Sequence, residues 1–508
     1  MHGEHFSAAE QALLAPYVTN LERPIFALQH LPEEVVAVLF AYYSRSRDSL
    51  RRNLLKLITA GDLGLVAPRE TVPAEPHDLT QAQEQARQFH EKWVVGYGHA
   101  SVAEHAVTHL ALEDVSIIAS KVIEDMRLAS YTEKSTRYVA FDAARYYPLP
   151  ELHGTDAGVV YHDTVRSLFT TYTTLLPRLI EAIKSDWPRS PRQTTRGFHT
   201  ACRAKALDIL RALLPAGTLT NLGMTINGRA LEHLLTKMLS HPLPEVQHLA
   251  TMLKEEARHI IPTLLKYADS NAYMVETDVI MRAMAQDIFR SQEPQAGPAV
   301  SLVRAPAEAE VHLVAAILFG YSQHAWSQVL AEAQALSDDH KAHVIDAYLH
   351  RRGPHDQPLR ALEHLSYTFD ILVDYGAYRD IHRHRMATQT RQFPSPSHGY
   401  SMPEEFVRYG AKEEFEVCMA RAAEAYCYLE TQHPQVAPYI LPLAYRCRVL
   451  ITWNLREMYH FVQLRSAKQG HTSYRRIAQD VYHCLAQQQP LLARYMRVDL
   501  EDYALGRL

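Results

Sequence analysis

The sequence predicts a mixed α and β fold in which helices dominate by number, arranged as two related units in tandem. Three observations support this prediction. The chain has 508 residues of which 47% are hydrophobic, enough to bury more than one core. Apolar residues recur at both helical and strand spacing. Segments of the second half also repeat, in the same order, segments of the first.

The repeat is clearest in residues 214–235 and 441–462. Each segment has a proline, an asparagine 12 positions later, an arginine two positions after the asparagine and a histidine six positions after it. Pro215, Asn227, Arg229 and His233 form the first set, and Pro442, Asn454, Arg456 and His460 form the second. Residues 37–46 resemble 316–325 and residues 102–114 resemble 361–374, so the two halves agree in register along the chain.

A segment rich in proline and alanine, residues 291–310, is typical of a linker. We therefore expect a first unit over 1–295 and a second over 296–508. The first unit is longer between its two recognisable elements: Arg127 precedes Pro215 by 88 positions, whereas Arg385 precedes Pro442 by 57. The extra residues are expected at about 145–195, where prolines and a glycine interrupt the pattern.

Local patterns predict individual elements. Residues 363–375 alternate apolar and polar side chains with aromatic and β-branched members, which predicts a half-buried strand. Residues 378–386, 449–465 and 244–268 have helical spacing. In the second of these, Asn454 and Arg465 are expected on one helical face, where the first unit has Asn227 and Met238.

Composition excludes several classes. A net charge of -5 and a pI near 6.7 argue against nucleic-acid or membrane partners. Five cysteines without CxxC spacing fit a reducing compartment, and neither a signal peptide nor a long apolar run is apparent, so we expect a soluble cytoplasmic protein. No metal site is expected, since the 29 histidines form no recognisable ligand array; His382 and His384 are the weak exception.

Two segments could bind anions. Arg383, His384 and Arg385 are consecutive, while residues 130–138 of the first unit combine Ser135 and Arg137. Paired guanidinium groups with a hydroxyl suit a phosphate monoester. Simpler explanations stay open for each alone: a basic helix end, a polar turn and, for Arg465, a solvated helix arginine.

Taken together, these residues resemble the flavin-dependent thymidylate synthases in a double-length form. The resemblance rests on GHASVAEH (98–105), on the RHR triplet at 383–385, on ASYTEKSTRY (129–138) and on the LP…NxR…H…LR series at 440–465. It extends from about residue 26 to residue 485.

The resemblance implies an α+β fold, helix-rich with antiparallel sheet, and members of the family form homotetramers. It implies methylation of dUMP to dTMP with methylenetetrahydrofolate, FAD as cofactor, NADPH as reductant and no cysteine nucleophile. By position, the flavin-binding residues are Arg383, His384, Arg385, His364, Asn454, Arg456 and His460. The residues expected to hold dUMP are Ser135, Arg137, Arg211 and Arg465. No catalytic residue is assigned.

The two units depart from the family in complementary ways. The first has Asp125, Met126 and Arg127 where the family has RHR, and the second has Pro438 where the first has Arg211. Asp380 also stands where the family usually has glutamine. We therefore expect a composite site between unlike units, in a homodimer that imitates a tetramer of single units with half its working sites. Two alternatives remain: a homologue that binds flavin or nucleotide without full activity, and an enzyme acting on another uridine-like substrate.

Overall fold

The structure is a computed structural model that describes all residues except 1–4, 45, 61–99, 192 and 504–508. The chain forms two compact bodies. The first body comprises Met1–Glu113, Leu128–Glu133 and Asn221–Arg290, and the second comprises Asp114–Arg127, Lys134–Thr220 and Ser291–Leu508. The second body therefore takes in two segments of the first sequence unit together with the whole of the second unit.

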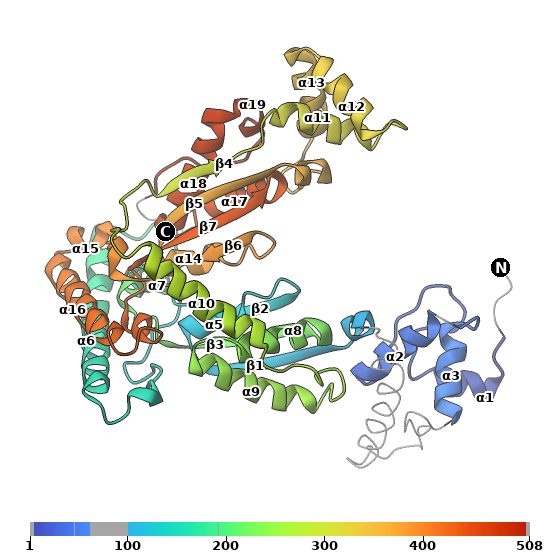
Figure 1. The fold of residues 1–508 in the computed structure, drawn as a ribbon, viewed down its shortest axis with the longest axis horizontal. Helices are drawn as coiled ribbons and strands as arrows, with labels where there is room; N and C mark the ends of the chain where they lie inside the picture. The colour runs from blue at the N-terminus through green and yellow to red at the C-terminus, as the bar shows by residue number, and fades with distance from the viewer. Residues whose placement is uncertain (1–4, 45, 61–99, 192, 504–508) are drawn as a thin grey trace. The chain divides into compact units, whose positions relative to one another are not determined.

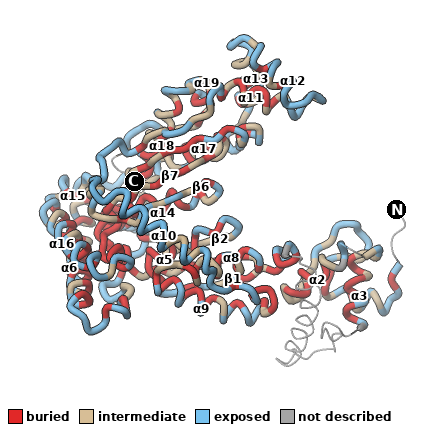
Figure 2. The backbone as a smooth tube through the Cα atoms, in the orientation of Figure 1, coloured by how far each residue is buried: buried red, intermediate tan, exposed pale blue. Residues whose placement is uncertain are grey.

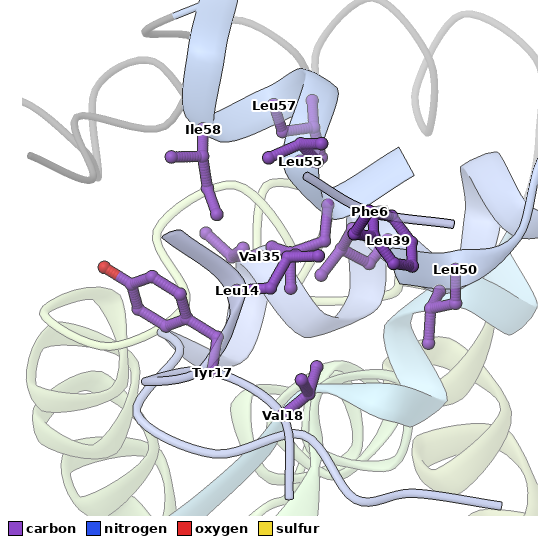
Figure 3. Close-up of a cluster of buried hydrophobic side chains, with 11 residues drawn as sticks. Phe6, Leu14, Tyr17, Val18, Val35, Leu39, Leu50, Leu55, Leu57 and Ile58 are labelled. Atoms are coloured by element: carbon purple, nitrogen blue, oxygen red, sulfur yellow. The ribbon is translucent and has the colours of Figure 1, made fainter. Parts of the chain in front are cut away.

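The first body begins with helices α1 (Ala8–Leu14), α2 (Glu33–Tyr43) and α3 (Leu50–Ala60). Their apolar faces meet in a cluster that includes Leu14, Val35 and Leu39, each fully buried (Figure 3). The Ser7 side chain accepts a hydrogen bond from the Glu10 N–H at the start of α1, and the Glu10 carboxylate accepts from the Ser7 N–H. This reciprocal capping fixes where the first helix begins.

A three-stranded sheet follows, made by β1 (Val107–Ser116), β2 (Ala129–Glu133) and β3 (Leu219–Asn227) in the order β1-β3-β2. β2 and β3 are antiparallel, with Ala129 opposite Ile226. The 3-10 helix η2 (Ala100–His105) precedes β1, and helices α8 (Gly228–Leu239), α9 (Pro244–Arg258) and α10 (Ala272–Ile288) follow β3. None of the residues of α10 is buried, as Figure 2 shows.

The second body is organised around a four-stranded antiparallel sheet (Figure 1). Its strands are β4 (Val300–Arg304), β5 (Ser366–Asp374), β6 (Thr388–Arg391) and β7 (Arg446–Asn454), in the order β4-β5-β7-β6. Trp453 on β7 is fully buried, and its ring lies 4.7 Å from that of Phe461 and 5.6 Å from that of Phe369. Aromatic packing of this kind anchors the following helix against the sheet.

Helices surround this sheet. The segments from the first unit contribute α5 (Ile117–Ile123), η3 (Pro150–Leu152), α6 (Asp156–Asp186), α7 (Thr195–Leu210) and η4 (Arg211–Leu213). The second unit contributes α11 (Ala309–Phe319), α12 (Trp326–Ala335), α13 (Asp338–Leu349), η5 (Arg360–His364), α14 (Tyr375–Ile381), η6 (Pro396–His398), α15 (Glu404–Arg408), α16 (Lys412–Glu430), η7 (Ala437–Ile440), α17 (Leu455–Ser466), α18 (Thr472–Gln488) and α19 (Pro490–Ala493).

The two sequence units share one topology. The first runs β1, α5, β2, β3, α8, and the second runs β5, α14, β6, β7, α17, with equivalent strand orders β1-β3-β2 and β5-β7-β6. The two Leu-Pro elements also pair with each other: the Leu443 N–H donates to the Leu214 carbonyl at 2.8 Å, and the Ala216 N–H donates to the Leu441 carbonyl at 2.8 Å. The predicted helix-rich α+β fold with antiparallel sheets and an internal repeat is therefore confirmed.

Three local predictions were wrong in part. The helix expected over 378–386 ends at Ile381, because the chain turns where the His384 N–H donates to the Ile381 carbonyl. Arg383 and Arg385 thus lie in a turn. Residues 449–454, expected as helix, are the end of strand β7, which pairs with both β5 and β6. The strand expected at 363–375 is β5, and the helical region at 244–268 is helix only as far as Arg258.

Candidate functional site

Arg137 is the most fully bonded of the predicted phosphate-binding residues. Its Nε and Nη2 donate to the two oxygens of Asp208 at 2.6 and 3.1 Å. Nη1 donates to the Tyr474 hydroxyl at 3.0 Å and Nη2 to the Gln469 carbonyl at 3.3 Å. Asp208 comes from the last turn of α7, and Tyr474 from the first turn of α18. The guanidinium therefore joins a loop of the first unit to a helix of the second.

Asp208 is the counter-ion of this arginine. Burial raises the pKa of the carboxyl, but His471, Arg137 and Arg211 together outweigh that effect and hold the pKa below its ordinary value. His471 lies close by, and burial lowers the pKa of its imidazole to about 3, so the ring is neutral at pH 7. The guanidinium groups are therefore the charges that keep Asp208 ionised. Ser135, also predicted, accepts the Arg137 N–H on its hydroxyl at 3.2 Å and shapes the turn.

Arg211 lies in η4, directly after α7, and only 3% of its surface is exposed. Its Nη1 donates to Asp380 Oδ2 at 3.3 Å. Nη2 is buried and has no acceptor among the described residues. A buried guanidinium N–H without an acceptor is unfavourable by about 1–3 kcal/mol, so this group is suited to one more oxygen ligand.

Arg465, in the last turn of α17, donates from Nε to His384 Nε2 at 2.9 Å. Since a guanidinium nitrogen is always a donor, the imidazole nitrogen must accept, and His384 must carry its proton on Nδ1. Burial, then the neighbouring Arg465 and His460, lower the pKa of His384 well below its ordinary value, in agreement with this neutral tautomer. Arg465 Nη1 also lies 4.0 Å from Asp380 Oδ1.

Asp380 on α14 thus lies between Arg211 and Arg465. Burial raises the pKa of this carboxyl, yet the charges of Arg211, Arg383 and Arg465 lower it by more, so it is ionised at pH 7. We call Arg137, Arg211, Arg465, Asp208 and Asp380 the arginine cluster. It combines side chains from both sequence units within the second body.

The triplet at 383–385 borders this cluster. Arg383 is exposed, His384 is buried against Arg465, and Arg385 donates from Nε to the Glu124 carbonyl at the end of α5 at 2.9 Å. The substituted triplet of the first unit lies nearby: Asp125 Oδ1 is 3.5 Å from His382 Nε2. Burial lowers the pKa of His382 to about 4, so this contact is a hydrogen bond to a neutral ring at pH 7.

The other predicted flavin-binding residues form a second group, near the start of α17. Asn454 caps this helix by accepting the Glu457 N–H at 2.8 Å. Arg456 donates to the Pro358 carbonyl at 2.7 Å and to Glu363 at 2.9 Å. His364 is exposed and lines a hollow of about 660 Å³ with Tyr348 of α13 and with residues of α11 and η5.

His460 links the two groups. Its exposed ring lies 5.7 Å from the ring of His384, and burial followed by the charges of Arg465 and Arg456 lowers its pKa. The structure therefore brings His384, His460, Arg211, Arg137 and Arg465 into one neighbourhood. Asn454 and Arg456 bond elsewhere, and His364 lines a separate hollow.

A cavity of about 850 Å³ adjoins the arginine cluster. Asp208 and Arg211 of the cluster line it, together with His471, Asp374 and Ser473. Asp374 caps α14 by accepting the Ala377 N–H at 2.7 Å and also accepts from the Ser473 hydroxyl. Burial raises the pKa of this carboxyl.

Sequence reasoning missed Asp208, Tyr474 and His471. Asp208 stands three positions before Arg211, and an acid so close to a predicted phosphate-binding arginine was the available signal. Tyr474 and His471 carried no such signal, because only the tertiary fold places α18 beside the Arg137 loop. Of the GHASVAEH segment, Gly98 and His99 lie outside the described residues, and Glu104 pairs with Arg229.

No described group of three or more His, Cys, Asp or Glu side chains is placed to hold a metal ion. Within the same residues, no helix has the length and apolar character required to cross a membrane.

Comparison with known proteins gives consistent results. A UPF0159 protein of Chlamydia muridarum is 35% identical over 99% of this chain and 97% of its own length. A UPF0159 protein of Thermoplasma acidophilum is 30% identical over 84% of this chain and 91% of its own. The flavin-dependent thymidylate synthase of Thermococcus onnurineus is 28% identical over 29% of this chain and 52% of its own length.

Among solved structures, the flavin-dependent thymidylate synthase ThyX of Helicobacter pylori, complexed with FAD and dUMP, aligns with 39% of this chain and all of its own. The TM-score is 0.31 at 18% identity, too low to support any conclusion. The family match is far more extensive. The Thy1 family, described as thymidylate synthase complementing protein, matches residues 60–263 and again residues 301–491. The chain therefore belongs to the Thy1 family, the flavin-dependent thymidylate synthase family, and carries the family region twice in tandem.

Proposed function

We propose that the chain methylates dUMP to dTMP, with methylenetetrahydrofolate as the carbon donor and FAD as cofactor, at one composite site formed by both sequence units. The observation that carries this proposal is the arginine cluster. Three arginines with little exposure, two from the first unit and one from the second, meet in one body around two carboxylates. Membership of the family supplies the reaction class.

In this proposal Arg211 and Arg465 hold the nucleotide phosphate, with Arg137 and Ser135 beside them. Guanidinium groups suit phosphate oxygens because their N–H groups can donate in parallel pairs. Arg211 already has a buried Nη2 without an acceptor among the described residues, and Arg465 is aimed by His384. Arg137 acts chiefly by positioning, since its donors are directed at Asp208, Tyr474 and Gln469.

The residues near the cluster also fit FAD. Arg383 is an exposed cation that precedes His384 in the chain, and the neutral rings of His384 and His460 lie 5.7 Å apart, a combination suited to a phosphate-bearing aromatic cofactor. Arg385, Asn454, Arg456 and His364 would complete the binding surface. FAD, when bound and reduced by NADPH, supplies the hydride that converts the transferred carbon to a methyl group.

The cysteines agree with a reaction that needs no thiol nucleophile. Burial raises the pKa of Cys202, Cys418 and Cys484, and it raises that of Cys447 to about 12. A reactive cysteine needs the opposite shift, because the thiolate is the nucleophile. Cys427 is exposed and lies on α16.

The first test is the visible absorption spectrum of the purified protein after incubation with FAD, recorded before and after addition of dUMP. Flavin bands that appear and then shift with dUMP would place both ligands in one pocket. A turnover assay with methylenetetrahydrofolate and NADPH should then yield dTMP. A protein that takes up no FAD, or a flavin spectrum indifferent to dUMP, would contradict the proposal.

A second candidate function is binding of flavin or nucleotide without full catalysis. The tight fork between Arg137 and Asp208 favours it, because those donors would otherwise be available to a ligand. One experiment distinguishes the enzyme from the binding protein. A flavin spectrum that responds to dUMP, in a protein that forms no dTMP, would support binding alone. Competition by other pyrimidine nucleotides in the same titration would reveal a different uridine-like substrate.

We also propose that the working species is a homodimer located in the cytoplasm. The unpaired state of all five cysteines supports this compartment. Fractionation of cells that produce the protein tests the location.

A further inference from the structure

Asp380 occupies an unusual position, since it is a carboxylate placed among the groups that would bind a phosphate. Its oxygens lie 3.3 Å from Arg211 Nη1 and 4.0 Å from Arg465 Nη1. We propose that Asp380 is a specificity-determining residue: it competes with a ligand phosphate for Arg211 and Arg465 and thereby weakens the binding of dianions. This inference rests on the function proposed above.

The distances distinguish Asp380 from the other carboxylate of the cluster. Asp208 grips Arg137 through two hydrogen bonds of 2.6 and 3.1 Å, the geometry of a permanent ion pair. Asp380 reaches neither of its arginines at such distances, and the contact with Arg465 is too long for a hydrogen bond. Asp208 therefore stays paired with Arg137 when a ligand binds. Asp380 makes longer contacts with Arg211 and Arg465, so a ligand oxygen can replace it as their partner.

The charges show what Asp380 does to a ligand. His384 and His471 are neutral, so the three arginines and two carboxylates of the cluster leave an excess of one positive charge, and Arg383 outside the cluster is a further cation that acts on Asp380. A phosphate monoester carries about 1.5 to 2 negative charges at pH 7. A ligand oxygen that bonds Arg211 Nη2 lies close to the Asp380 carboxylate, which bonds the same guanidinium. Repulsion between the phosphate and the Asp380 carboxylate therefore offsets part of the attraction between the phosphate and Arg211.

A neutral amide at position 380 would remove this repulsion and keep a hydrogen-bond acceptor for Arg211. The excess positive charge around the site would then increase by one, which favours a phosphate dianion. Asp380→Asn conserves shape, and Asp380→Gln places the same neutral amide on a side chain that is longer by one methylene. Asp370→Asn is the matched control, because Asp370 lies on β5 of the same body and pairs with Arg448, outside the arginine cluster.

The test is calorimetric titration of the full chain, after incubation with FAD, with dUMP, deoxyuridine and inorganic phosphate. For D380N and D380Q we expect dUMP and phosphate to bind about tenfold more tightly or better, whereas deoxyuridine binding changes by less than about twofold. D370N should match the unchanged chain, and R211A added to D380N should abolish the gain. Equal or weaker binding of dUMP and phosphate by D380N would overturn the inference.

The outcomes separate this inference from the proposed function. If phosphate binds more tightly to D380N while dUMP binds to neither protein, Asp380 controls the anion site and the uridylate reaction is wrong. If dUMP binds and turns over equally in both, the reaction stands and the role of Asp380 is wrong. Should both variants unfold in plain buffer, added phosphate must restore cooperative thermal unfolding, and failure to do so would count against the inference.

Discussion

Arg137 and Arg465 both have little exposure, yet different partners accept their N–H groups. Arg137 donates two hydrogen bonds to the Asp208 carboxylate. Arg465 donates to the neutral imidazole of His384, and its distant contact with Asp380 offsets its positive charge only in part. Removing one partner of a buried ion pair is unfavourable by about 3–5 kcal/mol, because the other charge remains uncompensated. Replacing Arg137 should therefore lower the free energy of unfolding more than replacing Arg465, even where both substitutions weaken ligand binding equally.

Arg137→Ala and Arg465→Ala are each expected to weaken dUMP binding by about 100-fold or more, because each removes a cation or its support from the proposed phosphate site. Lys237→Ala is the control, since Lys237 belongs to α8 of the first unit and takes no part in the arginine cluster. Calorimetric titration with dUMP measures all three. If all three variants lose the same dUMP affinity, the loss reflects the removal of positive charge in general and not a specific phosphate site.

Folding must be checked alongside, because Arg137→Ala leaves Asp208 buried without its counter-ion. The double variant Arg137→Ala, Asp208→Asn removes that unpaired charge and should regain most of the lost unfolding free energy. It should not regain dUMP binding. Recovery of binding in the double variant would show that the single substitution acted through stability.

Glu457 supplies a pH-dependent prediction. Burial raises the pKa of this carboxyl to about 7, against an ordinary 4.5, and its Oε2 has no partner among the described residues. Between pH 4.5 and 7 the folded chain therefore holds a proton that the unfolded chain has released, so this group makes stability fall as pH rises. Glu457→Gln removes that dependence.

Thermal unfolding at pH 5, 6, 7 and 8 measures the effect. The melting temperature of Glu457→Gln, relative to the unchanged chain, is expected to increase steadily across the series and to level off above pH 7. If the melting temperatures of the two proteins change in parallel with pH, the Glu457 carboxyl has the same pKa in the folded and the unfolded chain.

At the scale of elements, two asparagine caps offer a matched pair. Asn227 accepts the Ala230 N–H at 2.9 Å at the start of α8, and Asn454 accepts the Glu457 N–H at 2.8 Å at the start of α17. Alanine at either position should lower the unfolding free energy by about 1 kcal/mol through loss of the cap. If Asn454 also contacts flavin, only Asn454→Ala should weaken FAD binding as well.

Denaturant unfolding and titration with FAD measure the two effects separately. Asn454→Asp should keep the cap and therefore the stability, so any loss of FAD affinity in that variant reports on contact with the cofactor. Unchanged FAD affinity in both Asn454 variants would assign this residue to helix capping alone.

The same elements show how far the sequence could be interpreted. The strand at β5 was predictable because apolar and polar side chains alternate there. The helix expected over 449–465 was extended too far because the real helical spacing begins only after Asn454, whose capping chemistry marks the boundary. The end of α14 could not be predicted, since contacts from distant segments, such as Arg385 with the Glu124 carbonyl, hold the turn that follows.

At the scale of the whole molecule, the tandem repeat was visible in the sequence because its residues keep one register. The partners within the arginine cluster were not, because Asp208 and Tyr474 reach Arg137 across 71 and 337 positions of sequence. The pairing of the two Leu-Pro elements, seen in the hydrogen bonds of Leu443 and Ala216, is one of the contacts that bring these segments together, and the ion pair of Arg178 with Glu414 is another.

This pairing leads to a prediction about the number of sites. The second body collects one set of arginines, Arg137 and Arg211 from the first unit and Arg465 from the second. The reciprocal set is missing, because Met238 stands where the second unit has Arg465 and Pro438 stands where the first has Arg211. One dUMP and one FAD per chain are therefore expected.

Calorimetric titration gives this ratio directly, and sedimentation equilibrium gives the mass of the species that binds. A homodimer of the 57.8 kDa chain should have twice that mass and bind two dUMP molecules in all. Two dUMP molecules per chain would mean that Met238 and Pro438 do not disable the reciprocal site. One dUMP per two chains would instead mean that the arginine cluster of one chain is incomplete without a second chain. Either ratio of dUMP to chain would contradict the prediction that each chain contains one working site.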